Sequence, residues 1–132
     1  MTDLAIEIIT PAGVTFRGNI QSCTVPGADG MFQILNAHAD LLASLRIGEI
    51  KFKQADGEKH LATSSGFLEV SNNRISIVVE SAEFAAEIDV ERARAAEKRA
   101  KERLEEKGEV DTLRAELALA RALNRLKIAS RA

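Results

Sequence analysis

Residues 74–105 have the sequence RISIVVESAEFAAEIDVERARAAEKRAKERLE, and the spacing of apolar residues changes within this stretch. In Arg74–Val79 apolar residues recur at about every second position, which is the pattern of a half-buried β-strand. From Ile88 and Asp89 onward Pro is absent, Gly is nearly absent, and the helix formers Ala, Glu, Arg, Lys and Leu dominate. The change predicts strands before Ile88 and helices after it.

The N-terminal part repeats the strand pattern in short runs, for example Leu4–Ile9 and Ile20–Val25. Turn-forming residues separate the runs, as in Pro11-Ala12-Gly13 and Ser71-Asn72-Asn73. Short, regularly spaced strands suit a β-sandwich or flattened barrel, because a flat open sheet would leave long unpaired edges. The absence of Trp and Tyr further predicts a mainly aliphatic core.

The C-terminal part predicts two helices joined by a short turn. Asp89 suits the N-cap of a helix running to about Glu106, and Lys107-Gly108 would end it. A second helix should run from about Asp111 to Ala129, with apolar residues three or four apart at Leu113, Leu117, Ala120 and Leu123. The predicted class is therefore α+β, with a β-sandwich over residues 1–84 and an antiparallel helical hairpin over residues 85–132.

The apolar stripe of the first helix is weak, since it consists of Ala93, Ala96, Ala100 and Leu104. Alanine buries little surface compared with leucine or isoleucine, so the hairpin gains little by packing on itself. Isolated helices of this length are marginal in water, and part of the stability should come from the sandwich, another chain or a ligand. A conformational change of the hairpin is physically cheap.

The composition excludes several classes of function. With 132 residues and a net charge of -2, the chain is too small for a large multi-site enzyme and offers no global field for nucleic acid. No apolar run approaches the roughly 20 residues that span a bilayer, so no direct membrane span is expected. The single Cys23 lies in an alternating stretch and is expected to be a structural core residue.

Catalytic and metal-binding signals are poor. His38 and His60 lie in different segments, no metal-ligand spacing occurs, and no Gly-rich phosphate loop precedes a helix. We therefore expect no catalytic residues, no metal site and no enzymatic activity of the chain's own.

Charged residues of the helical part share faces. Asp89 and Arg92 are three residues apart, Arg92 and Arg99 seven apart, and Arg121 and Arg125 four apart. If these faces meet in the hairpin, several guanidinium groups converge, and such groups suit bidentate binding of phosphate oxygens.

The alternative is a solvated face with ion pairs inside each helix. Glu97 and Lys101, four residues apart, have the spacing of such a pair. The residue pattern alone leaves both interpretations open.

The whole chain resembles the epsilon subunit of F-type ATP synthases. The residues that carry the resemblance are TPAG at Thr10–Gly13, VPGADGMFQIL at Val25–Leu35, SGFLEV at Ser65–Val70, Ile88-Asp89 followed by Arg92-Ala93, and ALARALNRL at Ala118–Leu126. One departure is Asn36-Ala37-His38-Ala39-Asp40, where the family often has Pro-Gly-His-Ala-Pro, and it leaves the rigidity of that turn open.

The resemblance implies a non-catalytic subunit at the foot of the central stalk, on the cytoplasmic side of the cell membrane as a peripheral component. Its sandwich would touch the gamma subunit and the c-ring and couple rotation to proton translocation. Its hairpin would either fold onto the sandwich or extend along gamma to the catalytic alpha and beta subunits and impede ATP hydrolysis. The competing interpretation is a purely structural coupling subunit, and a remote one is a free-standing ligand-binding β-protein.

The resemblance also implies that ATP is a regulatory ligand, although no cofactor is required. Some bacterial members bind ATP through an Ile/Leu-Asp-x-x-Arg-Ala motif and arginines of the second helix. The motif matches Ile88, Asp89, Arg92 and Ala93, with Glu83, Arg99, Arg121 and Arg125 as companions. In the extended state, acidic residues of the catalytic subunits or gamma would pair with Arg114, Arg121, Arg125 and Lys127.

Overall fold

The computed structural model describes residues 4–106 and 112–132, and this part of the chain holds ten strands followed by helices. The strands are β1 (Leu4–Thr10), β2 (Gly13–Ile20), β3 (Ser22–Gly27), β4 (Gly30–Leu35), β5 (Leu41–Leu45), β6 (Gly48–Gln54), β7 (Gly57–Thr63), β8 (Gly66–Ser71), β9 (Arg74–Val79) and β10 (Ala82–Phe84). The helices are the 3-10 turn η1 (Ala85–Glu87), α1 (Val90–Glu105) and α2 (Thr112–Ala129).

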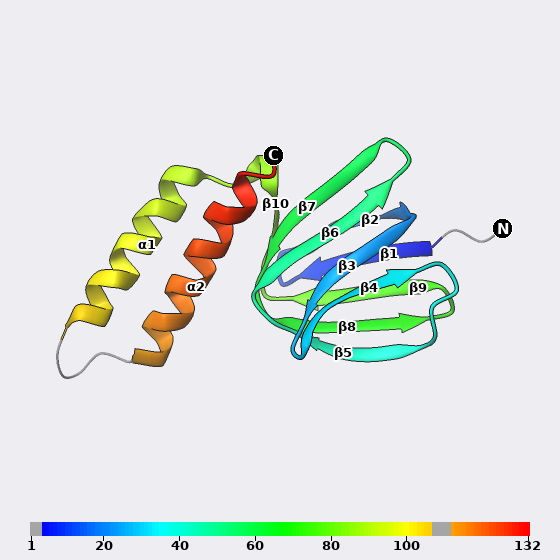
Figure 1. Cartoon of the computed structure of the whole chain (residues 1–132), viewed down its shortest axis with the longest axis horizontal. Helices are drawn as coiled ribbons and strands as arrows, with labels where there is room; N and C mark the ends of the chain where they lie inside the picture. Colours follow the sequence, from blue (N-terminus) through cyan, green and yellow to red (C-terminus); the bar gives the residue numbers. More distant parts are fainter. Residues whose placement is uncertain (1–3, 107–111) are drawn as a thin grey trace.

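The strands form one continuous sheet in the order β10-β7-β6-β3-β5-β8-β9-β1-β2, and β4 pairs with β3. The sheet folds over on itself into two layers (Figure 1). The end strand β2 approaches β6 of the other half of the sheet, where the side-chain amide of Gln54 on β6 donates to the carbonyl oxygen of Asn19 on β2 at 3.3 Å. The predicted sandwich or flattened barrel is confirmed.

The core between the layers is aliphatic, as the composition predicts. Phe52 is the only aromatic residue among the largest fully buried side chains of the described residues, and Ile and Leu fill most of the rest. Cys23 is completely buried among them. Burial raises the pKa of its thiol to about 12, because the apolar core disfavours the thiolate.

The turn between β8 and β9 is a two-residue hairpin turn. Asn72 and Asn73 have φ angles of 51° and 60°, the left-handed region that asparagine tolerates better than most residues. Asn73 also holds the β4–β5 loop, since its side-chain oxygen accepts from the backbone N–H of Ala37 at 2.7 Å and its amide donates to the Asn36 side chain at 2.5 Å. The loop that departs from the family pattern is therefore held by hydrogen bonds instead of proline.

The helices lie side by side as an antiparallel hairpin (Figure 1). Asp89 is the N-cap of α1, and its side chain accepts from the backbone N–H of Arg92 at 3.1 Å. The helix ends at Glu105, close to the predicted Glu106. The predicted turn at Lys107-Gly108 and the predicted start at Asp111 lie outside the described residues.

The buried residues of the hairpin are mostly alanine: Ala93, Ala100, Ala115 and Ala122. The small side chains let the two helices pack closely. The predicted apolar row of α2 points the other way, because Leu113, Leu117 and Leu123 are 65%, 42% and 45% exposed and Ala120 is exposed as well. The spacing of these residues correctly predicted that they share one face of α2, but this face is exposed and the alanines on the other side are buried.

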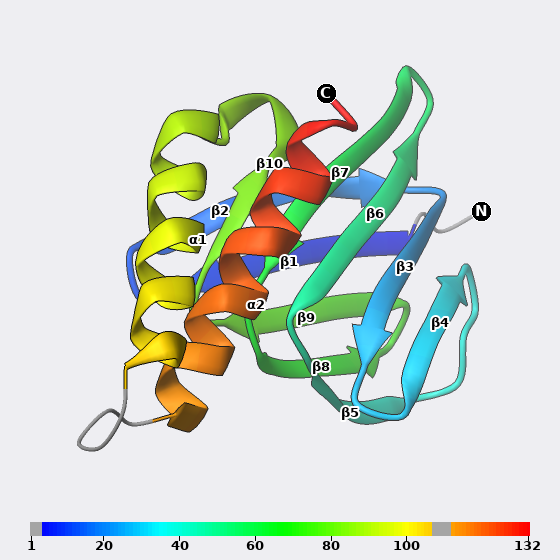
Figure 2. The same ribbon diagram turned by 60° about the vertical axis from the view of Figure 1, so that its left-hand side comes forward.

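The hairpin contacts the sandwich through α2, which lies between α1 and strands β6 and β7 (Figures 1 and 2). Near the C-terminal end of α2, Ile128 is 1% exposed and packs in a second apolar cluster with Ala62, Ala85 and Ile88. One turn earlier, the Asn124 side chain donates to the carbonyl oxygen of Gly48 at 2.8 Å. Ile128, the partly buried Ala129 and a few polar contacts thus hold the hairpin on the sandwich.

Candidate functional site

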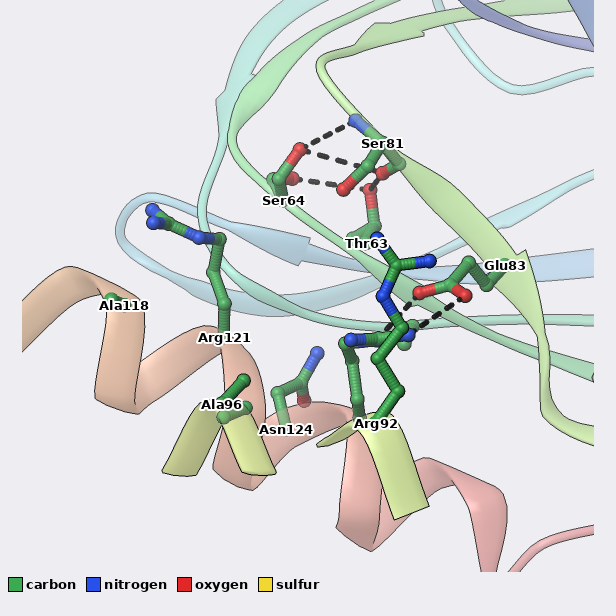
Figure 3. Close-up of a pocket in the computed structure, with 12 residues that line it drawn as sticks. Thr63, Ser64, Ser81, Glu83, Arg92, Ala96, Ala118, Arg121 and Asn124 are labelled. Carbon is green, nitrogen blue, oxygen red and sulfur yellow. Dashed lines mark hydrogen bonds and ion pairs between the residues drawn. The ribbon is translucent and has the colours of Figure 1, made fainter. Parts of the chain in front are cut away.

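A cavity of about 410 Å³ lies where the sandwich, α1 and α2 meet (Figure 3). Its size falls within the range of small-molecule sites. The sandwich contributes Ala62, Thr63, Ser64, Ser81 and Glu83, α1 contributes Arg92 and Ala96, and α2 contributes Ala118, Arg121, Ala122, Asn124 and Arg125. Because all three parts supply walls, the cavity exists only while the hairpin is folded onto the sandwich.

A bidentate ion pair crosses the cavity from β10 to α2. The Arg125 Nε atom lies 2.7 Å from Glu83 Oε1, and its Nη2 atom lies 3.2 Å from Oε2. The side chains are 23% and 34% exposed, so water screens the pair only in part. Two residues that are 42 positions apart in the sequence are joined in this way.

Two further arginines reach into the same space. Figure 3 shows Arg92 extending from α1 toward Glu83 and Thr63, whereas Arg121 rises from α2 on the Ser64 side of the cavity. Neither forms an ion pair with another residue in the described ranges 4–106 and 112–132. The lining thus carries three guanidinium groups against one carboxylate, and this excess of positive charge favours an anionic ligand.

The opposite wall is built from hydroxyl groups of the sandwich. Thr63 and Ser64 both donate to the carbonyl oxygen of Ser81, at 3.2 and 3.4 Å, and the backbone N–H of Ser81 donates to the Ser64 hydroxyl at 2.8 Å. Thr63 and Ser64 are nearly buried, so these bonds fix the wall. These residues were not predicted from the sequence, although the polar run Thr63-Ser64-Ser65 interrupts the apolar residues Leu61-Ala62 and Phe67-Leu68.

The predicted ATP-binding residues divide into two groups. Glu83, Arg92, Arg121 and Arg125 line the cavity together. The others do not line it: Ile88 packs in the second apolar cluster, Asp89 caps α1, Ala93 is fully buried, and Arg99 is exposed on α1. The buried and capping members of the motif therefore shape the start of α1 and so position the Arg92 side chain.

Of the four residues predicted to make contacts in the extended state, two line the cavity and two do not. Arg121 and Arg125 lie in the cavity, whereas Arg114 and Lys127 are exposed on α2. Lys127 borders a separate groove next to Gly48 and Glu49.

Metal binding and membrane crossing find no support in the described residues. Among them no group of three or more His, Cys, Asp or Glu side chains gathers as a metal site would require. Neither of the described helices is long and apolar enough to cross a bilayer.

Two family models match the chain in succession. The β-sandwich domain of the ATP synthase delta/epsilon chain matches residues 3–85, and the long α-helix domain of the same chain matches residues 86–130. The ATP synthase epsilon chain of Desulforamulus reducens is 46% identical over 125 residues, which cover 94% of this chain and 95% of the relative. The ATP synthase epsilon chain of Bacillus pumilus is 37% identical over 131 residues, covering 99% and 100%.

Solved structures show the same fold. A chain of the Euglena gracilis mitochondrial ATP synthase, from a structure of OSCP, F1 and c-ring, has a TM-score of 0.83 at 18% identity and covers 100% of this chain and 83% of its own. A chain from the central stalk and c-ring of the Tetrahymena thermophila mitochondrial ATP synthase has a TM-score of 0.59 at 17% identity, covering 98% and 96%. The family models and the curated relatives show that the chain belongs to the family of ATP synthase epsilon chains.

Proposed function

We propose that this chain is a non-catalytic central-stalk subunit of a proton-translocating F-type ATP synthase, peripheral to the cytoplasmic side of the membrane. Its sandwich couples gamma to the c-ring, and its hairpin inhibits ATP hydrolysis when it extends. ATP bound to the folded-down hairpin relieves that inhibition. Membership of the epsilon family, together with a cavity that exists only in the folded-down state, supports the proposal.

The outer face of the sandwich offers a surface for gamma. Phe67 pairs with Val78, Val78 with Ile9, and Ile9 with Val14, so these residues form a row across β8, β9, β1 and β2. Phe67, Val78 and Val14 are 61%, 51% and 51% exposed. Contiguous exposed apolar side chains mark protein-binding surfaces, and we assign this row to the contact with gamma.

The outer face of α2 supports an inhibitory extended state. Leu113, Leu117 and Leu123 are exposed in the folded-down hairpin, so an extended arm that buried them would recover apolar contacts. Arg114 and Lys127 on the same helix would pair there with acidic residues of the catalytic subunits or gamma.

Removing the hairpin separates inhibition from a bracing role. Truncation after Ile88 in the assembled complex should raise ATP hydrolysis while assembly stays intact. Lost assembly or coupling with unchanged hydrolysis would favour a purely structural subunit.

ATP sensing rests on one observation, the convergence of Arg92, Arg121 and Arg125 with Glu83 on one cavity. Arg92 belongs to α1, Arg121 and Arg125 to α2, and Glu83 to the sandwich, so a triphosphate bound there would bridge all three parts. A ligand shifts a conformational equilibrium only by its differential affinity for the two states. Because the extended arm separates these groups, ATP would select the folded-down state.

Calorimetric titration of the isolated chain with ATP tests this site. Arg92→Ala should weaken binding roughly 10- to 100-fold, since hydrogen bonds to charged groups contribute about 1.5–3 kcal/mol each. Arg94→Ala on the same helix is the matched control, because Arg94 is exposed and pairs with Glu91 at 3.6 Å. No detectable heat at millimolar ATP would refute nucleotide sensing.

A further inference from the structure

The start of β6 holds the C-terminal part of the hairpin through two contacts, of which the one to Arg131, just after α2, lies outside the nucleotide cavity. The Asn124 side chain donates to the carbonyl oxygen of Gly48 at 2.8 Å, and Arg131 Nε donates to Glu49 Oε2 at 3.2 Å. Gly48, Glu49 and Arg131 are absent from the lining of the cavity. A ligand in the cavity would therefore leave the Glu49–Arg131 pair intact.

The Glu49 carboxylate also has a partner within the sandwich, which does not depend on the hairpin. The Nδ1 atom of His60 on β7 lies 3.0 Å from the same Oε2 atom that accepts from Arg131. Glu49 and His60 side chains are each 20% exposed, and both lie on paired strands of the sandwich. An acceptor that is already oriented loses less side-chain entropy when the pair forms, so more of the attraction remains as stability.

The pair inside the cavity behaves differently. The Arg125 guanidinium group donates two hydrogen bonds to the Glu83 carboxylate. Phosphate oxygens of a ligand would compete with Glu83 for these donors. The Glu83–Arg125 contact thus contributes to docking only until a ligand enters. The Glu49–Arg131 contact contributes to docking of the hairpin both before and after a ligand enters the cavity.

We propose that Glu49 and Arg131 form a latch that stabilises the folded-down hairpin without nucleotide and thereby raises the apparent affinity for ATP. The second half of this proposal rests on the proposed function. When only a fraction of the molecules is competent to bind, the apparent dissociation constant is the intrinsic one divided by that fraction. Glu49 and Arg131 are positioning residues, since they act on the cavity through the hairpin.

The latch adjusts the equilibrium without deciding it. Arg131 is 42% exposed, and exposed ion pairs change an equilibrium by about two- to fivefold. This is the change expected in the docking equilibrium constant when either partner is removed.

The test is the docked fraction of the full chain in the absence of ATP. Cysteines introduced by Leu123→Cys in α2 and Asp56→Cys in the β6–β7 turn carry a pair of dyes, and energy transfer between the dyes reports docking. The native Cys23 is buried and stays unlabelled. Glu49→Ala and Arg131→Ala should each lower the docking equilibrium constant about two- to fivefold. The double variant should lower it no further, because each substitution removes the same contact.

Controls separate the latch from general stability and from ATP sensing. Arg17→Ala removes a comparable exposed pair with Glu7, 2.6 Å apart within the sandwich, and should leave docking unchanged. Docking that is unchanged in both single variants, or strictly additive losses in the double variant, would overturn the latch. If docking falls as expected but the wild type binds no ATP, the latch stands and nucleotide sensing fails.

Affinity for ATP provides the second readout. The dissociation constant should rise in Arg131→Ala by the ratio of the two docked fractions, and Arg131→Lys should restore part of the docking. An ATP affinity that falls without any change in docking would assign Arg131 to the ligand instead of to the latch.

Discussion

Replacing Ile128 with alanine should release the C-terminal end of α2 from the sandwich. Ile128 is 1% exposed and packs with Ala62, Ala85 and Ile88, in a cluster separate from the sandwich core. The substitution removes three carbon groups worth about 0.8 kcal/mol each, or roughly 2.4 kcal/mol before any cavity is counted. The polar docking contacts contribute about 1 kcal/mol each, so Ile128 is the largest single contributor. The docking equilibrium should fall by roughly 50-fold.

Hydrogen exchange of the α2 backbone amides measures this effect. Exchange in α2 should accelerate in Ile128→Ala while exchange in the sandwich core stays slow. Leu123→Ala is the matched control on the same helix, because Leu123 is 45% exposed and its loss should change stability by less than about 0.5 kcal/mol. Equal protection of α2 in the two variants would refute the role assigned to Ile128.

Three further predictions concern the scaffold. The thiol of Cys23 stays neutral in the folded chain up to a pKa of about 12 but ionises near 9.0 when unfolded, so the unfolded state binds fewer protons above pH 9. The free energy of unfolding should therefore fall by about 1.4 kcal/mol per pH unit between those values, in urea titrations, and Cys23→Ala should lack that slope. Gly66→Ala should destabilise the sandwich by about 1–3 kcal/mol or more, because the added Cβ would lie 2.1 Å from the carbonyl oxygen of Val78; an unchanged urea midpoint would contradict this. Asp89→Ala should lower helix content by removing an N-cap worth about 1 kcal/mol, and circular dichroism that matches the wild type would disprove it.

The parts of the fold that depend on local chemistry were predictable from the sequence. Alternation identified Leu4–Ile9 and Arg74–Val79 as strands, and both begin and nearly end where expected. Asp89 has the side chain and position of an N-cap, so it located the start of α1. These signals act within a few neighbouring residues and need no knowledge of the tertiary structure.

The parts that depend on packing were not predictable. Which face of α2 is buried depends on the close approach of α1, and the alanines at Ala115 and Ala122 permit that approach better than leucines. The wall at Ser64 and Ser81 forms because β7 and β10 pair, which brings together polar residues from two separate runs. Pairs such as Glu49 with Arg131 span 82 positions of sequence and follow only from the docked hairpin.

The arginine pattern of the hairpin is an intermediate case. Arg92, Arg121 and Arg125 could be named from their helical spacing, and the structure brings them to one cavity. The alternative of ion pairs inside a helix also occurs, because Glu97 and Lys101 lie 3.4 Å apart on α1. Convergence at the cavity and an ion pair within the helix thus occur for different residues of α1, and phosphate binding by the arginines stays a prediction.

The most direct test of nucleotide sensing measures docking while ATP is added. The dye-labelled chain carrying Ile128→Ala is the sensitive background, because its docking equilibrium constant should be roughly 50-fold lower than that of the wild type and a ligand has more room to shift it. We expect ATP to restore docking there, and the added substitution Arg92→Ala to move the restoration to roughly 10- to 100-fold higher ATP concentrations. A docked fraction that stays constant, or falls, up to millimolar ATP would contradict the claim that the folded-down hairpin forms the nucleotide site.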